Sequence, residues 1–122
     1  SWTTSKERRF EMNNIELVRG YHDVTLLCPV CSGEYLHQDS VKAFWRDSED
    51  GPANVVTSTT NYVSVVREEN GKIPGRRDCI DIDFGCEAGH NLTMRILQHK
   101  GRTFLSWIKI EIEEDPIAMG GK

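Results

Sequence analysis

The sequence predicts a mainly β protein with one antiparallel sheet of five to seven strands and at most one short N-terminal helix. Stretches of alternating apolar and polar residues, typical of strands that bury one face, recur from residue 35 to residue 112. Turn-forming pairs at 70–71 and 74–75 separate these stretches. Because 122 residues suffice for one domain with a modest core, we expect residues 1–122 to form a single domain.

The N-terminal part of the chain has a weaker pattern. Residues 1–20 fit neither a helical stripe nor a strict alternation. Thr4 and Glu7 have the spacing of a capping box, so we expect a short helix that runs into an extended segment. The apolar run at 24–28 predicts a buried strand that ends at Cys28.

Two strands and a turn are expected next. Apolar and aromatic residues at odd positions from 35 to 45 predict a strand with one apolar face, which includes His37. Residues 47–54 contain Gly51-Pro52 and predict a turn. Residues 55–67 are rich in Val and Thr and predict the following strand.

Residues 68–78 contain two Gly-bearing turn pairs and predict a loop, and 79–84 predict the strand after it. The apolar residues at 80, 82 and 84 are expected to face inward, which turns Cys79, Asp81 and Asp83 outward.

The last hairpin joins strands at 92–97 and 104–112 and is expected to turn through the three-residue loop His99-Lys100-Gly101. This register pairs Gln98 with Arg102, Ile96 with Phe104 and Leu92 with Ile108. It leaves an outer apolar patch of Leu97, Leu105 and Trp107 beside Arg95, and this patch is either covered by the N-terminal segment or is a partner surface. Residues 115–122 are expected to form a flexible tail.

Four residues have the chemistry and spacing of a metal site. Cys28 and Cys31 form a C-x2-C pair in the turn Cys-Pro-Val-Cys-Ser-Gly, and Cys86 and His90 form a C-x3-H pair. Structural Zn²⁺ takes four sulfur or nitrogen ligands in a tetrahedron, and folding brings distant pairs together. We therefore predict one structural zinc site at these four residues.

Two other residues are rival ligands. His37 lies on the strand after the first pair, and it remains an alternative to His90 as the fourth ligand. Cys79 would lie about 23 Å from Cys86 along an extended strand, so we expect Cys79 to be a free thiol.

A catalytic zinc keeps one coordination position for water, whereas here the protein can fill all four. The sequence therefore favours a protein that is not an enzyme. Glu87, next to Cys86, is the only carboxylate that we can nominate as a base for the alternative of a zinc-dependent hydrolase.

The charge argues against non-specific binding of nucleic acid over a broad surface, because the chain has 15 basic and 19 acidic residues and a net charge of −4. A local basic patch leaves nucleic-acid binding open as an alternative, with affinity that falls steeply with salt. The residues nominated as a partner surface are Arg67, Lys72, Arg76, Arg77, Arg95, Leu97, Lys100, Arg102, Leu105 and Trp107.

The sequence contains no apolar run near the ~20 residues that a membrane span needs. We therefore expect a cytoplasmic protein that does not contact membranes. In such a reducing compartment, four cysteines are thiols or metal ligands more often than disulfides.

The strings Cys-Pro-Val-Cys-Ser-Gly-Glu-Tyr-Leu-His, Phe84-Gly85-Cys86-Glu87 and Gln98-His99-Lys100-Gly101-Arg102-Thr103-Phe104 resemble those of small bacterial and phage proteins with a split zinc-ribbon-like site. The resemblance covers roughly residues 24–110 and implies bound zinc without implying an activity. In such relatives the second metal turn tends to be C-x2-C, and this chain has Cys86-Glu87-Ala88-Gly89-His90 instead. We expect a zinc-stabilised module that binds another protein, such as an inhibitor or adaptor in a bacterial or phage system.

Overall fold

The structure is a computed structural model, and it describes residues 15–69 and 73–112. These residues form eight β-strands and no helix. The strands are β1 (Leu17–Arg19), β2 (Val24–Leu26), β3 (Leu36–Arg46), β4 (Ala53–Thr59), β5 (Val63–Glu68), β6 (Cys79–Cys86), β7 (His90–His99) and β8 (Arg102–Ile112). The expected helix and the expected C-terminal tail lie outside the described residues.

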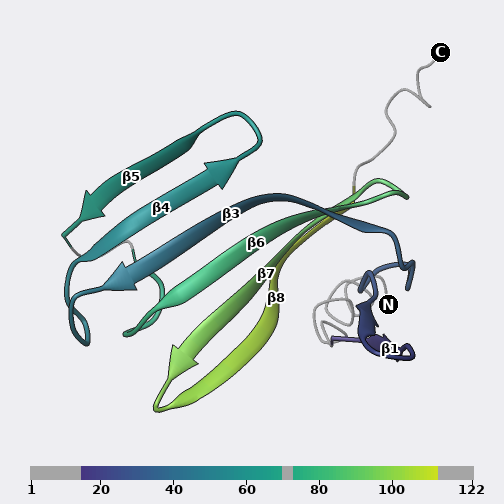
Figure 1. The fold of residues 1–122 in the computed structure, drawn as a ribbon, viewed down its shortest axis with the longest axis horizontal. Coiled ribbons are helices and arrows are strands. Elements are labelled where there is room, and N and C mark those ends of the chain that lie inside the picture. The colour runs from purple at the N-terminus through teal and green to yellow at the C-terminus, as the bar shows by residue number, and fades with distance from the viewer. Residues whose placement is uncertain (1–14, 70–72, 113–122) are drawn as a thin grey trace, which may run out of the picture.

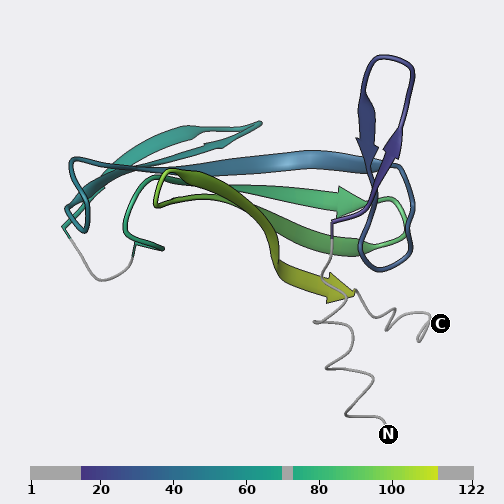
Figure 2. The ribbon, with the colours of Figure 1, turned by 90° about the horizontal axis from the view of Figure 1, so that it is seen from below.

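Six strands form one open antiparallel sheet in the order β5-β4-β3-β6-β7-β8, and β1 pairs with β2 in a separate hairpin (Figure 1). This arrangement confirms the predicted antiparallel β fold. Within this sheet, only the connection from β5 to β6 joins strands that are not neighbours, because the β4–β5 hairpin adds to the outer side of β3 while β6 pairs with its inner side. The β1–β2 hairpin stands away from the plane of the sheet at one end (Figure 2).

We name the two ends of the sheet by what lies there. The cysteine end is where β6 finishes at Cys86 and β7 begins at His90. The loop end is where β3 finishes at Arg46 and β6 begins at Cys79. Strands β3, β6, β7 and β8 run between the two ends, so both ends belong to one continuous ladder.

The pleat gives the sheet two faces, because successive side chains of a strand point to opposite sides. Face A carries Ile80, Ile82 and Phe84 of β6, and face B carries Cys79, Asp81 and Asp83. Cys79 is buried at 1% exposure, so the prediction that it faces outward is wrong. Face B is covered at the loop end, which the alternation of β6 alone does not reveal.

Each end has its own apolar core, on a different face. At the cysteine end the core lies on face A, where partly buried residues of the N-terminal hairpin and the first cysteine turn cover the sheet. Its members are Cys28, Phe84, Cys86, Leu92, Met94 and Trp107. At the loop end the core lies on face B and consists of Phe44, Ala53, Val55, Ile73 and Cys79, with Leu97 packed against it.

Strand β3 contains an irregularity that the sequence pattern did not predict. Its register against β6 shifts between Gln38 and Ser40, so that Asp39 is an extra residue. A bulge moves the following residues to the opposite face, and His37 therefore does not share a face with Val41. The expected single apolar face from 35 to 45 is wrong in this detail.

The β7–β8 hairpin turns through two residues, not three. His99 pairs with Arg102, and Lys100 and Gly101 both have positive φ, at 50° and 79°. Two positive φ angles are the requirement of a type I′ turn, whose twist suits a hairpin. The actual pairs are Gln98–Thr103, Leu97–Phe104, Ile96–Leu105 and Leu92–Ile110.

A second irregularity, between Thr93 and Met94, compensates for the shorter turn. It realigns the residues beyond it, so that Leu92 pairs with Ile110. The two-residue turn alone sets the register that places Trp107 opposite Met94 on face A, where Trp107 is 2% exposed and meets Phe84 edge-on at 5.9 Å between ring centroids. For Trp107, the alternative of an exposed partner surface is therefore wrong. Its indole belongs to the core at the cysteine end.

Candidate metal centre

The first ligand pair lies in a tight turn that directly follows β2. The Cys28 N–H donates to the Gly33 carbonyl at 2.9 Å, and the Ser32 N–H donates to the Cys28 carbonyl at 2.8 Å. Ser32, not Gly33, adopts the left-handed conformation, with φ of 62°. A Cβ at residue 33 would lie 3.3 Å from Cys31 Sγ, so a glycine there leaves room for the sulfur.

The second pair lies in the connection from β6 to β7. Cys86 is the last residue of β6 and His90 the first of β7. The Gly89 N–H donates to the Cys86 carbonyl at 2.9 Å, and Gly89 has φ of 97°. This left-handed residue closes the turn and brings His90 back beside Cys86, because glycine adopts such angles without a Cβ clash.

In each of the two turns, a backbone N–H points at the sulfur of the cysteine that begins the turn. In the first, the Val30 N–H points at Cys28 Sγ at 3.4 Å, and in the second the Ala88 N–H points at Cys86 Sγ at the same distance. Backbone N–H groups directed at a sulfur stabilise its thiolate form, which is the form that binds metals. Both turns are therefore suited to present anionic sulfur.

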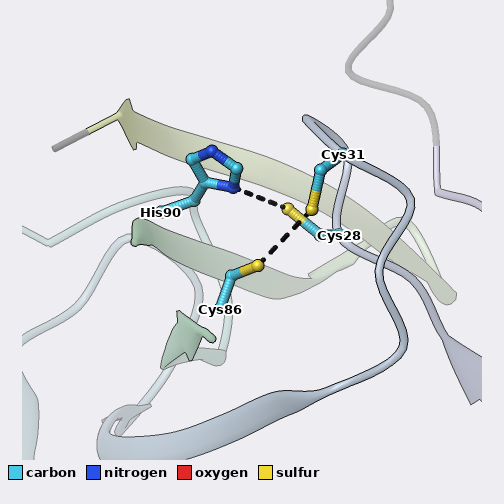
Figure 3. Close-up of side chains that lie close together, drawn as sticks. All are labelled: Cys28, Cys31, Cys86 and His90. Atoms are coloured by element: carbon cyan, nitrogen blue, oxygen red, sulfur yellow. Dashed lines mark hydrogen bonds between the residues drawn. The ribbon is translucent and has the colours of Figure 1, made fainter. Parts of the chain in front are cut away.

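Folding brings the four residues together (Figure 3). One ligand atom from each of Cys28, Cys31, Cys86 and His90 lies within 4.8 Å of all the others. The Sγ atom of Cys28 is 3.5 Å from His90 Nδ1, and the Sγ atoms of Cys31 and Cys86 are 3.5 Å apart. Three sulfurs and one imidazole nitrogen at this spacing can hold a metal ion.

Cys28 and Cys31 differ in burial, and the pKa values of their thiols are shifted in opposite directions. Cys28 is fully buried, and this burial raises the pKa of its thiol to about 11. At the exposed Cys31, desolvation acts to raise the pKa, but a backbone hydrogen bond from Gly33 and the neighbouring thiols of Cys86 and Cys28 outweigh it and lower the pKa. A metal that binds at neutral pH must therefore displace a proton from Cys28.

His37, the rival fourth ligand, has a different partner. Its Nε2 atom lies 2.7 Å from a carboxylate oxygen of Glu87, and both side chains are exposed. His37 is not part of the cluster that the described residues form. The same contact occupies Glu87, the residue nominated as a hydrolytic base.

The outer acidic residues of β6 are also paired. Asp81 accepts two hydrogen bonds from Arg95, at 2.8 and 2.9 Å. Asp83 accepts from Ser40 at 2.8 Å and from Thr93 at 2.6 Å. These contacts cross β3, β6 and β7, so Asp81 and Asp83 join neighbouring strands on face B.

The structure does not bring the nominated partner surface together as one patch. Arg67 pairs with Asp47, Arg76 with Asp50 and Glu49, and Arg77 with Glu49. Lys72 lies outside the described residues. Leu97 is half-buried, Trp107 is buried, and Leu105 lies on the other face from Leu97. Lys100 and Arg102 lie at the exposed tip of the β7–β8 hairpin, where Arg102 covers the ring of Phe104.

The sequence patterns missed an exposed apolar surface beside the cysteine end. It comprises Leu17, Val18, Tyr21 and Val24 of the β1–β2 hairpin together with Tyr35, and each is at least half exposed. Tyr21, at the hairpin tip, is 94% exposed. The apolar run at 24–28 predicted a buried strand. The composition of the run does not show that the strand belongs to a two-stranded hairpin, where part of it stays exposed.

No helix in the described ranges is long and apolar enough to cross a membrane. Comparison with known protein families, with curated proteins and with solved structures found no match, and the candidate metal centre is therefore supported by its own geometry and chemistry.

Proposed function

We propose that this chain is a non-enzymatic binding module, stabilised by one structural Zn²⁺, that acts through contact with another protein. The observation that carries the proposal is the convergence of Cys28, Cys31, Cys86 and His90 within 4.8 Å. A role as an inhibitor or adaptor in a bacterial or phage system is the form of this proposal that the sequence resemblance suggests.

Zinc is the metal that suits this donor set best. Three thiolates and one imidazole are the ligands of closed structural zinc sites, and Zn²⁺ accepts a tetrahedron without preference for other geometries. The four residues would hold the ion, and the bound ion would cross-link the turn after β2 to the β6–β7 turn. The two turns are more than fifty residues apart in the chain, so this link would fix the N-terminal hairpin on the sheet.

A filled coordination sphere supports binding over catalysis. Hydrolytic zinc needs an open position for water and a base beside it. Here four protein donors surround the site, and Glu87 is hydrogen-bonded to His37. The proposal of a zinc-dependent hydrolase therefore has less support.

Protein contact has more support than nucleic-acid binding. Four of the nominated arginines, Arg67, Arg76, Arg77 and Arg95, each pair with a carboxylate, which reduces the positive potential available to phosphate. Beside the cysteine end, the β1–β2 hairpin exposes Leu17, Val18, Tyr21 and Val24. Exposed aromatic and aliphatic side chains on a hairpin fixed by a metal are typical of a protein-binding surface.

Capture of partners from a lysate of the encoding organism tests this function, with zinc-loaded protein as bait. We expect a protein partner that survives nuclease treatment and that Tyr21→Ala weakens at least tenfold. The matched control is Tyr62→Ala, because Tyr62 is also exposed but lies on the β4–β5 turn. A nuclease-sensitive partner, or equal losses in the two variants, would contradict the proposal.

A further inference from the structure

Strand β5 is an edge of the sheet that carries little protection against pairing with another strand. Val63, Val65 and Val66 are 67%, 64% and 50% exposed, so the strand is exposed on both faces. Charged residues occur only at its last two positions, Arg67 and Glu68. Natural edge strands are usually blunted by Lys, Pro or a bulge, and β5 has none of these.

The opposite edge, β8, also exposes apolar side chains, but it carries the protection that β5 lacks. Its pairing with β7 is interrupted between Thr93 and Met94. Lys109 and Glu111 stand along its outer half, and Arg102 begins the strand. A bulge and alternating charges are the ordinary means of blocking an edge. The sheet is thus protected at β8 and open at β5.

We infer that β5 pairs antiparallel with β5 of a second copy of this chain, giving a two-fold symmetric dimer with a continuous sheet. A two-fold axis perpendicular to the sheet keeps face A beside face A, so residues pair only when both lie on the same face. Registers centred on Val65 and on Val66 both use the whole strand, and we choose Val65 because it is the more exposed of the two, at 64% against 50%. The register centred on Val65 places Val65 opposite Val65 of the second copy, Ser64 opposite Val66 and Val63 opposite Arg67.

Charge excludes two registers that are centred closer to the C-terminal end of β5. A register centred on Arg67 or on Glu68 would place like charges directly opposite each other, which is destabilising. In the register centred on Val65, Arg67 instead lays its aliphatic stem beside Val63 while its guanidinium stays with Asp47. Glu68 then faces Tyr62, so no like charges meet.

The dimer does not use the cysteine end. An antiparallel pair points the two cysteine ends in opposite directions, which leaves both β1–β2 hairpins accessible. Because only one strand per copy contributes, the interface belongs to the small and weak class. We therefore expect the dimer to form at micromolar to millimolar concentration of the chain.

The first test is sedimentation equilibrium of the zinc-loaded protein over that concentration range. We expect a concentration-dependent dimer of the wild type, and a monomer throughout for Val65→Lys, which sets two ammonium groups against each other at the two-fold axis. Val18→Lys is the matched control, because Val18 is similarly exposed on β1. We expect it to dimerise like the wild type.

The second test fixes the register and does not depend on how well Val65→Lys folds. Cysteines directly opposite each other lie within disulfide reach, so Val65→Cys should cross-link to itself under mild oxidation. Val63→Cys should not, because its two copies would be about 13 Å apart along the strands. The unsubstituted protein, with its own four cysteines, gives the background.

Three results would overturn the inference. The wild type could stay monomeric at the highest concentration, as it would if another segment of the chain occupies the β5 edge. A dimer could persist in Val65→Lys while that variant keeps the wild-type circular dichroism spectrum. Val63→Cys could cross-link as readily as Val65→Cys.

Discussion

The apolar surface of the sheet is covered at both ends, but by chemically different means. A single layer of six strands must cover apolar surface on both faces, and one short chain cannot wrap both completely. At the cysteine end, face A is covered by turns that meet at a Cys₃His cluster. At the loop end, face B is covered by a loop whose apolar contact is Ile73.

The covering loop at the loop end is held by hydrogen bonds from one arginine. The guanidinium of Arg46 donates to the carbonyls of Gly51 at 2.5 Å, Ile73 at 3.1 Å and Gly75 at 2.5 Å. Asp78 accepts from the Arg46 backbone N–H at 2.9 Å. One end is thus suited to a metal cross-link, and the other depends on hydrogen bonds and packing, so different changes should weaken them.

Loss of a metal ligand should have the largest effect. Cys86→Ser removes one sulfur of the cluster and should lower the free energy of unfolding by on the order of 5 kcal/mol, because binding free energy at a structural site is folding free energy. Cys79→Ser at the loop end replaces a buried thiol by a more polar hydroxyl that keeps Asp81 as an acceptor, and it should cost no more than about 1–3 kcal/mol. Urea unfolding measures both, and equal losses would mean that the cysteine end is not metal-stabilised.

Removing the largest side chain of the core at the cysteine end comes next. Trp107→Ala should cost about 3–5 kcal/mol in urea unfolding, because it deletes a buried indole and leaves a cavity against Phe84. Phe104→Ala is the matched control on the same strand, since Phe104 is 41% exposed. We expect a cost below about 1 kcal/mol there. Similar losses in both variants would show that Trp107 is not a core residue.

At the loop end, Arg46→Ala should cost about 2–3 kcal/mol, because it leaves carbonyls of the covering loop without their charged donor. Lys42→Ala, at an exposed position of the same strand, should change stability by less than about 0.5 kcal/mol. Hydrogen exchange should show increased opening at residues 73–78 in Arg46→Ala, with the cysteine end unchanged. Increased opening at both ends would mean that the two covers are not independent.

Alkaline pH should also act through the loop end, by a gradual effect that grows with each pH unit. Burial raises the pKa of Cys79 to about 12 from its ordinary value of 9.0. Below pH 9 the thiol is protonated in both states. Above it, the unfolded chain loses the proton while the folded chain keeps it, so stability falls as pH rises, by up to about 1.4 kcal/mol per pH unit.

Cys79→Ala removes this contribution. Its free energy of unfolding should therefore fall less steeply between about pH 9 and about pH 11 than that of the wild type. Parallel slopes for the two proteins would mean that the Cys79 thiol is not buried in the folded state.

Local patterns predicted most of the strands and the four residues of the cluster. The single strand expected over 55–67 is wrong, because this segment forms β4 and β5 with a turn between them at residues 60–62. The alternation around Ile82 and the C-x2-C spacing of Cys28 and Cys31 are properties of short segments, so they can be read without the fold. His90 could also be predicted, because the type of donor atom and the length of the turn after Cys86 can both be read from a short segment. The antiparallel fold class is confirmed, and the four nominated ligands lie together.

Errors arose where a long-range feature decides the outcome. The bulge at Asp39 and the irregularity opposite Trp107 shift the facing of later residues, and no local pattern announces either. Burial of Cys79 depends on Phe44, Ala53 and Val55, which belong to distant strands of the chain, as well as on Ile73 of the preceding loop. A sheet whose two ends are covered on different faces cannot be inferred from alternation, because alternation assumes the same inner face along each whole strand.

Elemental analysis of the purified protein, in parallel with His90→Ala and His37→Ala, tests the central claim most directly. The account predicts one zinc ion per chain in the wild type and in His37→Ala, and loss or marked weakening of zinc binding in His90→Ala. Zinc retained unchanged by His90→Ala, or lost in His37→Ala, would contradict it. Either result would show that the cysteine end is not held by the Cys28, Cys31, Cys86 and His90 set.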